Sequence, residues 1–156
     1  MGMDVYGKSS TTEAGDYFRA NCWSWRPIHE LMCDHADDLF SERTMQLMGS
    51  NNGAGLCCQD KCDMLADRLE EAMASIDWKT DKRGKEYYEP WPEYHLVTES
   101  GHLLNNNGTV NIYNPDTKEC EEEVYTGELY SAYRTYREHL EEFVTFLRGC
   151  GGFEVW

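Results

Sequence analysis

The stretch Tyr17-Phe18-Arg19-Ala20-Asn21-Cys22-Trp23-Ser24-Trp25-Arg26-Pro27 is the densest group of large side chains in the sequence. Four of its eleven residues are aromatic and two are arginines. A buried aromatic side chain removes about 150–250 Å² from water, so such a group normally lies where several elements meet. We expect a hub against which helices and two terminal strands pack. Its arginines need acceptors if buried, so one side of the hub should reach the surface, near residues 49–55.

The residues on either side of the hub predict a strand and two helices. Met3–Tyr6 is compatible with a short strand that Gly7 closes. Ser10, Thr11 or Thr12 is expected to cap a short helix through the hub. Pro27 suits the first turn of a helix that runs to about Phe40, and a second helical piece follows at 41–48. The inward face of the first of these helices consists of Ile28, Leu31, Met32, Ala36 and Leu39.

Two later segments have the spacing of amphipathic helices. One runs from about Cys58 to Ile76, and the other from about Glu128 to Gly149. The glycines at 149, 151 and 152 are a stop signal for the second helix. Phe153–Trp156 is then predicted to form a strand that pairs beside the first strand, because apolar residues continue to position 156.

The region between these helices lacks the regular apolar spacing of a helix. Residues 78–97 contain two prolines and no period, which predicts an irregular loop or insertion. Residues 103–125 predict a hairpin or meander, with the Asn107-Gly108 pair suited to a tight turn. The fold class that follows is α+β: one domain over 1–156, with about three main helices on a small, mostly antiparallel sheet that includes both termini.

Composition limits the classes of function. The 156 residues carry 14 Lys and Arg against 29 Asp and Glu, a net charge of −15. Such a surface repels nucleic acid phosphates and favours basic partners. No run approaches the ~20 apolar residues of a membrane span, and the first residues lack the pattern of a signal peptide. We therefore expect a cytoplasmic protein with no direct nucleic acid or membrane partner.

The seven cysteines are expected to be reduced and mostly buried, since their number is odd and no export signal precedes them. Cys58 and Cys62 fall on the apolar face of the predicted 58–76 helix, which favours a role in the core. Together with Cys57 they give three thiols within six residues, but not the CxxC spacing of redox or zinc sites.

Several runs resemble a group of uncharacterised small proteins from bacteria and their phages. They are Met1–Lys8, Tyr17–Arg19 with Trp23–Pro27, Asn52–Leu56, and Phe146–Val155. The resemblance covers about the first 76 residues and the last 25. It implies the fold outline and a phage or prophage origin. Members of that group often have a zinc-ribbon-like insert in the middle, but here Cys120 is the only cysteine between Ile76 and Glu128, so no zinc site is implied.

The glycine-rich segment 49–55 before a helix can cradle an anion with its backbone N–H groups, although it matches no nucleotide-binding fingerprint. A connecting loop is the simpler interpretation. If the segment does bind a small phosphate-bearing ligand, arginines would supply counter-charge and tryptophans a stacking face. The candidate ligand-binding residues are Arg19, Trp23, Trp25, Arg26, Asn52, Gly53 and Gly55.

His29 and Cys33 lie one helical turn apart and could share a metal, but zinc sites need three or four ligands. No nucleophile elbow is present, and no carboxylate pair can be singled out for acid–base work. We assign no catalytic residue, metal ligand or cofactor. A small metal-dependent enzyme that uses the His29 and Cys33 region remains the alternative function.

The leading hypothesis is an acidic, non-enzymatic binding protein of phage origin. It would inhibit a host protein, such as a defence protein, by occupying a basic surface or by sequestering a small nucleotide-like ligand. The candidate partner-binding residues are Glu119, Glu121, Glu122 and Glu123. They lie in the last strand of the expected hairpin, which is predicted to be strongly acidic on its outer face.

Overall fold

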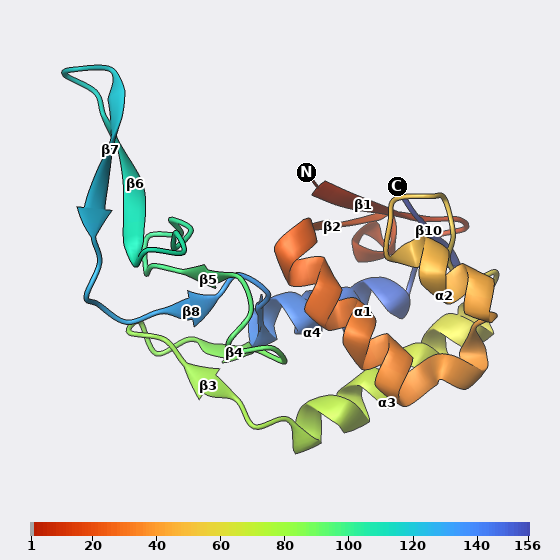
Figure 1. The fold of residues 1–156 in the computed structure, drawn as a ribbon. Coiled ribbons are helices and arrows are strands. Elements are labelled where there is room, and N and C mark those ends of the chain that lie inside the picture. The colour runs from red at the N-terminus through yellow and green to blue at the C-terminus, as the bar shows by residue number, and fades with distance from the viewer. Residues whose placement is uncertain (1) are drawn as a thin grey trace. The chain divides into compact units, whose positions relative to one another are not determined.

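A computed structural model describes residues 2–156 and confirms an α+β architecture. The chain divides into two compact units (Figure 1). The first consists of the residues up to Tyr88 together with Thr135–Trp156, and the second is Glu89–Arg134. In the described part of the chain, no helix is both long and apolar enough to cross a membrane.

The first unit is built on a three-stranded antiparallel sheet in the order β10-β1-β2. The central strand is β1 (Gly2–Gly7), β2 is Tyr17–Asn21 and β10 is Phe153–Val155. The predicted pairing of the last strand beside the first is confirmed, with Val5 opposite Val155. Ala54 forms a further bridge to Val155 on the outer side of β10. The strand at the end of the sequence therefore lies inside the sheet.

The hub stretch is a strand followed by a helix, so the short helix expected through it is wrong. Tyr17–Asn21 alternates between exposed and buried residues, which is the period of a half-buried strand. The helical piece is only the 3-10 turn η1 (Glu13–Gly15), capped by Thr12. Helix α1 (Cys22–Ala36) then begins where the Asn21 side chain accepts a bond of 2.8 Å from the Ser24 amide. Pro27 consequently lies in the second turn of α1, not in its first.

After α1 come the 3-10 turn η2 (Asp37–Leu39), α2 (Glu42–Met48), α3 (Gln59–Ser75) and α4 (Arg137–Leu147). Helices α1 and α4 pack against the β10-β1-β2 sheet, and α3 packs against both of them to enclose the core. The inward face predicted for the first of them is confirmed. Its five members are all buried, but Leu39 lies on η2, because α1 ends at Ala36 and not near Phe40 as predicted. The other four are Ile28, Leu31, Met32 and Ala36.

The hub prediction holds for two of its aromatics. Phe18 and Trp25 are buried and both contact Phe143, at ring-centroid distances of 5.0 and 5.6 Å. The indole N–H of Trp25 donates to the Met48 carbonyl at 2.9 Å, which ties α1 to the end of α2. Tyr17 is at the surface. The hub thus joins the sheet to α1, α2 and α4.

The region before the last helix differs from the prediction. Helix α4 starts at Arg137 and not near Glu128, and the residues before it include the two-residue strands β8 (Tyr130–Ser131) and β9 (Thr135–Tyr136). The expected irregular loop at 78–97 also contains short strands: β3 (Lys79–Thr80), β4 (Glu86–Tyr88) and β5 (Leu96–Val97). Strands β3, β4 and β9 form a second small sheet in the first unit.

The second unit consists of two small antiparallel pairs. β5 pairs with β8, and β6 (Thr109–Asn114) pairs with β7 (Glu119–Val124) as the predicted hairpin. The turn of Asn107 and Gly108 lies before β6, where Gly108 adopts φ 78° and the chain reverses between Leu104 and Val110. In the same unit, Tyr133 packs against Trp91 and Tyr94 at ring-centroid distances of 5.7 and 5.8 Å.

Replacement of Phe153 by alanine should strongly destabilise the first unit. The Phe153 side chain is fully buried against Phe143 and Phe146. Loss of a buried phenylalanine costs about 3–5 kcal/mol. Urea unfolding should therefore show a loss in that range for Phe153→Ala. Tyr6→Ala on the same sheet is the control, since Tyr6 is half exposed and its loss should cost about 1 kcal/mol or less. Equal losses would contradict an inner role for β10.

Candidate functional site

The seven candidate ligand-binding residues do not line one pocket. Trp25 is buried with 1% of its surface exposed, so protein covers the ring faces that a base would stack on. Arg19, on β2, and Arg26, on α1, are exposed, whereas Trp23 is half-buried. Arg19 lies 3.8 Å from Asp4 and lines a groove whose other walls belong to η1 and α4. None of the other six residues lines that groove.

The loop at 49–55 serves the sheet. The Gly53 amide donates to the Val155 carbonyl at 2.8 Å, and the Ala54 carbonyl accepts from the Val155 amide at 2.9 Å. Gly53 has φ 70° and packs on the Trp156 ring, where a Cβ would come within 2.5 Å of a ring carbon. A Cβ on Gly55 would meet the Phe153 carbonyl oxygen. The glycines are therefore explained by close packing on β10, and α3 begins only at Gln59. Asn52 is exposed and bonds the Ser50 carbonyl.

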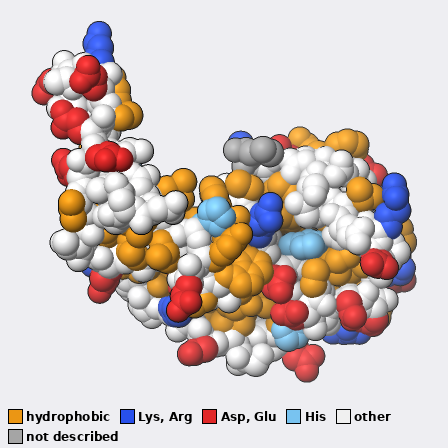
Figure 2. Space-filling view, viewed as in Figure 1, with side chains coloured by type: hydrophobic (Ala, Val, Ile, Leu, Met, Phe, Trp, Pro, Cys, Tyr) orange, Lys and Arg blue, Asp and Glu red, His pale blue; other side chains and the backbone are white. Residues whose placement is uncertain are grey.

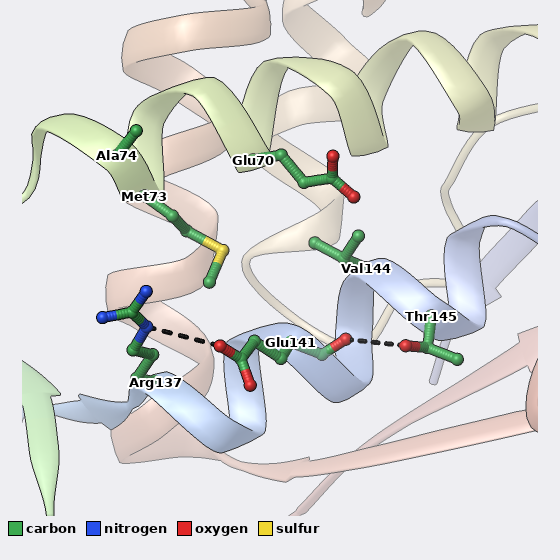
Figure 3. A pocket seen from close by; sticks show the side chains of 7 residues that line it. All are labelled: Glu70, Met73, Ala74, Arg137, Glu141, Val144 and Thr145. Atoms are coloured by element: carbon green, nitrogen blue, oxygen red, sulfur yellow. Dashed lines mark hydrogen bonds and ion pairs between the residues drawn. The ribbon is translucent and has the colours of Figure 1, made fainter.

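A groove of about 410 Å³ lies between α3 and α4 (Figure 3). Its floor is apolar, with Met73 and Val144 almost fully buried. Carboxylates stand on both sides: Glu70 projects from α3 and Glu141 from α4, and Arg137 closes one end (Figure 3). The remaining lining residues are Ala74 and Thr145.

The charged groups of this groove already have partners within the first unit. Arg137 pairs with Glu141 at 3.3 Å and with Glu86 at 3.1 Å, and its guanidinium lies over the Trp78 ring. Glu70 lies 3.2 Å from Arg148. No cysteine, serine or histidine lines the groove. Both glutamates of the groove are thus held in ion pairs with arginines of the first unit.

The opposite side of α4 borders the larger groove, of about 700 Å³, that Arg19 also lines. Glu138, Glu141, Glu142 and Thr145 are exposed along α4, so a ridge of carboxylates separates the two grooves. This ridge was not predicted from the sequence. Its signal was present as acidic residues spaced three and four apart in the predicted last helix.

His139 lies at the base of this ridge. Its ring packs on Phe18 at a centroid distance of 4.8 Å, and Nδ1 is 3.5 Å from a carboxylate oxygen of Glu142. Burial lowers the pKa of His139, and the charge of Glu142 opposes that effect without cancelling it. His139 is therefore favoured as the neutral imidazole in the folded protein.

His29 and Cys33 lie together as predicted, but both ring nitrogens of His29 already have hydrogen-bond partners. Nε2 of His29 is 2.6 Å from the Met45 carbonyl, so this nitrogen carries the proton and donates it. Nδ1 is then left as the acceptor for the Cys33 thiol at 3.8 Å. Burial, with the charges of Glu30, Asp34 and Asp37, raises the pKa of Cys33. Among residues 2–156, no group of three or more metal-ligating side chains is placed to hold an ion.

The four candidate partner-binding glutamates lie together on β7. All six residues of this strand are exposed. By its register with β6, Glu119, Glu121 and Glu123 share one face with Val110 and Ile112. The other face carries Glu122, Tyr113 and Val124, and the last two are 59% and 78% exposed.

Comparisons with protein-family models, with curated proteins and with solved structures find no significant match to this chain.

Stability should fall on mild acidification because of His139. In the unfolded chain a histidine titrates near pH 6.5, whereas the pKa of folded His139 is lower. As the pH falls below about 6.5, the unfolded state takes up this proton more readily, so the free energy of unfolding decreases until the folded pKa is passed. Urea unfolding between about pH 7.5 and about pH 5 measures this slope.

His139→Gln should flatten that part of the pH dependence. The exposed His35 provides the matched control, and His35→Gln should keep the wild-type slope. A wild-type slope in His139→Gln would show that another group is responsible.

Proposed function

We propose that the protein is a non-enzymatic binding module whose acidic β7 strand docks on a basic surface of a partner protein. The observation that carries the proposal is the set of four exposed glutamates on β7 that have no cationic partner among the residues described. The unit that holds them, residues 89–134, has nine acidic and two basic residues. Its net charge of −7 is nearly half that of the chain.

The acidic groups of the first unit behave differently. Asp67 and Glu70 share Arg148, and Glu86 and Glu141 share Arg137. Much of that charge is thus compensated within the unit. On β7 the nearest polar contact is an Asn114 amide 3.5 Å from Glu121. Repulsion between neighbouring carboxylates is unrelieved there, and a cationic partner would relieve it.

The geometry of β7 favours one kind of partner segment. Within the second unit this strand pairs with β6 alone, so its outer edge is open. Carboxylates on an open edge oppose pairing between two copies of the same strand. They attract an extended segment rich in lysine or arginine, which would add to the edge through backbone hydrogen bonds. Figure 2 shows acidic side chains along the hairpin.

The biological role in this proposal follows from the resemblance to small bacterial and phage proteins. A phage protein of this charge would inhibit a host protein, such as a defence protein, by occupying a basic surface that the host uses for something else. Sequestration of a nucleotide-like ligand has weaker support, because Trp25 is buried and the loop at 49–55 packs on β10. Enzymatic use of His29 and Cys33 has no specific observation in its favour.

Neutralisation of the four glutamates should weaken binding to a basic strand. The probe is a fluorescein-labelled peptide of alternating lysine and threonine, and the variant is Glu119→Gln, Glu121→Gln, Glu122→Gln and Glu123→Gln combined. Exposed ion pairs contribute about 0.2–1 kcal/mol each, so the dissociation constant measured by fluorescence anisotropy should rise about tenfold. Wild-type binding should weaken as salt rises above about 0.1 M, where the screening length is about 10 Å.

A second variant with the same change in net charge separates docking on β7 from general attraction. Glu13→Gln, Glu71→Gln, Asp77→Asn and Glu93→Gln alter exposed acidic residues elsewhere and should leave the affinity within about twofold of wild type. Equal weakening in both variants would reduce the effect to net charge and remove the docking role of β7.

A further inference from the structure

Four of the seven cysteines gather where the start of α3 meets the turn after α4. Cys57 and Cys58 come directly before α3, Cys62 lies in its first turns, and Cys150 lies in the turn. The two segments are locked together by Gln59. Its side chain accepts from the Gly151 amide at 2.7 Å and donates to the Leu147 carbonyl at 2.8 Å. The thiols are thus held by a rigid junction within the first unit.

The exposure of these thiols divides them into two pairs. Cys62 and Cys150 are fully buried, and each thiol shifts the pKa of the other. Cys57 is exposed and Cys58 is half-exposed, which differs from the core position predicted for Cys58. The expectation of mostly buried thiols is likewise wrong, since Cys62 and Cys150 are the buried ones. The outer pair, Cys57 and Cys58, is open to small reagents.

The sulfurs of the outer pair are in contact. The Cys57 thiol donates to the Cys58 sulfur at a distance of 3.3 Å. The junction holds this segment closely, because a Cβ on Gly152 would come within 2.7 Å of the backbone of Cys57. Two thiols at this separation need to move by little more than 1 Å to form a bond, since the S–S length is about 2.05 Å.

The surroundings of Cys58 favour its thiolate. The backbone N–H of Lys61 and the thiol of Cys57 both interact with the sulfur and lower the pKa of Cys58, while burial and the charge of Asp60 oppose them. Cys58 is also the N-cap residue of α3, and the first backbone amides of a helix have no partner within that helix. The inner pair is different: the neighbouring thiol of Cys150, together with burial, raises the pKa of Cys62. Cys62 lowers the pKa of Cys150, but Cys150 is fully buried. Thiolate is the nucleophile in thiol exchange, so Cys58 is the accessible nucleophile of the cluster.

We propose that Cys57 and Cys58 form a thiol-exchange site, at which Cys58 attacks small disulfides and Cys57 resolves the product. The Cys58 thiolate bonds to one sulfur of a small disulfide, the S–S bond of the reagent breaks, and the other half leaves as a thiolate. Cys57 then gives up its proton and attacks the Cys58 sulfur. This step forms the Cys57–Cys58 bond and releases the second half, which takes up a proton.

The reaction balances and can be reversed. Two protein thiols lose two electrons, and the small disulfide gains them to become two small thiols. The Cα atoms of adjacent residues are about 3.8 Å apart, whereas disulfide-bonded cysteines usually have Cα atoms about 4.4–6.8 Å apart. The Cys57–Cys58 bond is therefore strained, and small thiols will reduce it readily. The site would respond to the balance of thiols and disulfides around the protein.

Reaction of the reduced protein with the neutral disulfide 4,4′-dithiodipyridine tests the proposal. Absorbance of the released thiopyridone should show a fast phase of two equivalents, about tenfold faster than the reaction of Cys120. Peptide mass mapping should then find a Cys57–Cys58 disulfide without a pyridyl adduct. Cys57→Ser should release one equivalent in the fast phase and retain the adduct on Cys58. Cys58→Ser should lose the fast phase.

Cys120→Ser is the matched control, because Cys120 is exposed on β7 and its sulfur has no thiol contact among the described residues. This variant should keep the fast phase unchanged. A fast phase that survives Cys58→Ser, or an oxidised product that maps to Cys62–Cys150, would overturn the proposal. Should Cys58→Ser fail to fold, the single equivalent and the retained adduct in Cys57→Ser decide the matter on their own, since a second equivalent there would also overturn it.

Discussion

The insertion of β10 between β1 and the segment at 54–56 is the constraint on which the first unit depends. The amides of Phe153 and Val155 donate to the Leu56 and Ala54 carbonyls on one side, each at 2.9 Å. On the other side Asp4 and Trp156 exchange two backbone bonds of 2.7 Å. Phe153 and Val155 are fully buried as a result. A strand of only three residues, β10, thus connects the sheet, the loop at 49–55 and the aromatic core.

This insertion also explains the glycines of the loop at 49–55. Gly53 and Gly55 leave no room for a side chain, because the Trp156 ring and the Phe153 carbonyl lie against them. The hub contributes Phe18 and Trp25 to the same core, in which Phe143 is the shared neighbour. What resembles an anion loop in the sequence is thus a packing surface in the fold.

Long periodic segments were predictable from the sequence. The helix expected at 58–76 is α3, because its apolar spacing continues over five turns. Short strands could not be predicted, since β8 and β9 have two residues each and no pattern of their own. Pairing of β9 with Tyr87 and Tyr88 overrides the helical tendency of the residues before Arg137. The short helix predicted through the hub was wrong for a related reason. The alternation over Tyr17–Asn21 is only five residues long, and helix α1 follows it directly. The cap of that helix, Asn21, is also common in loops, so it did not mark the start of the helix in the sequence.

The candidate residues could be named from the sequence, but the side chains that pack against them could not. Composition was enough to single out the glutamates of β7, because charge on a strand between two turns is almost always exposed. Burial of Trp25 and the contact between Cys57 and Cys58 depend on packing between distant segments. Nothing in the local pattern of residues 57–62 shows that the turn after α4 will lie against it.

The division of the chain in Figure 1 affects the order in which the protein can fold during synthesis. The second unit is continuous from Glu89 to Arg134, so all of its contacts are available before α4 has been made. The first unit is discontinuous, and its sheet lacks β10 until residues 153–155 emerge. Its first 88 residues must therefore wait with Val5 and Phe18 uncovered, which is the stage at which chaperones or aggregation compete with folding. The residues of the acidic hairpin, with both of its strands, all precede α4, so its charge is already present during that interval.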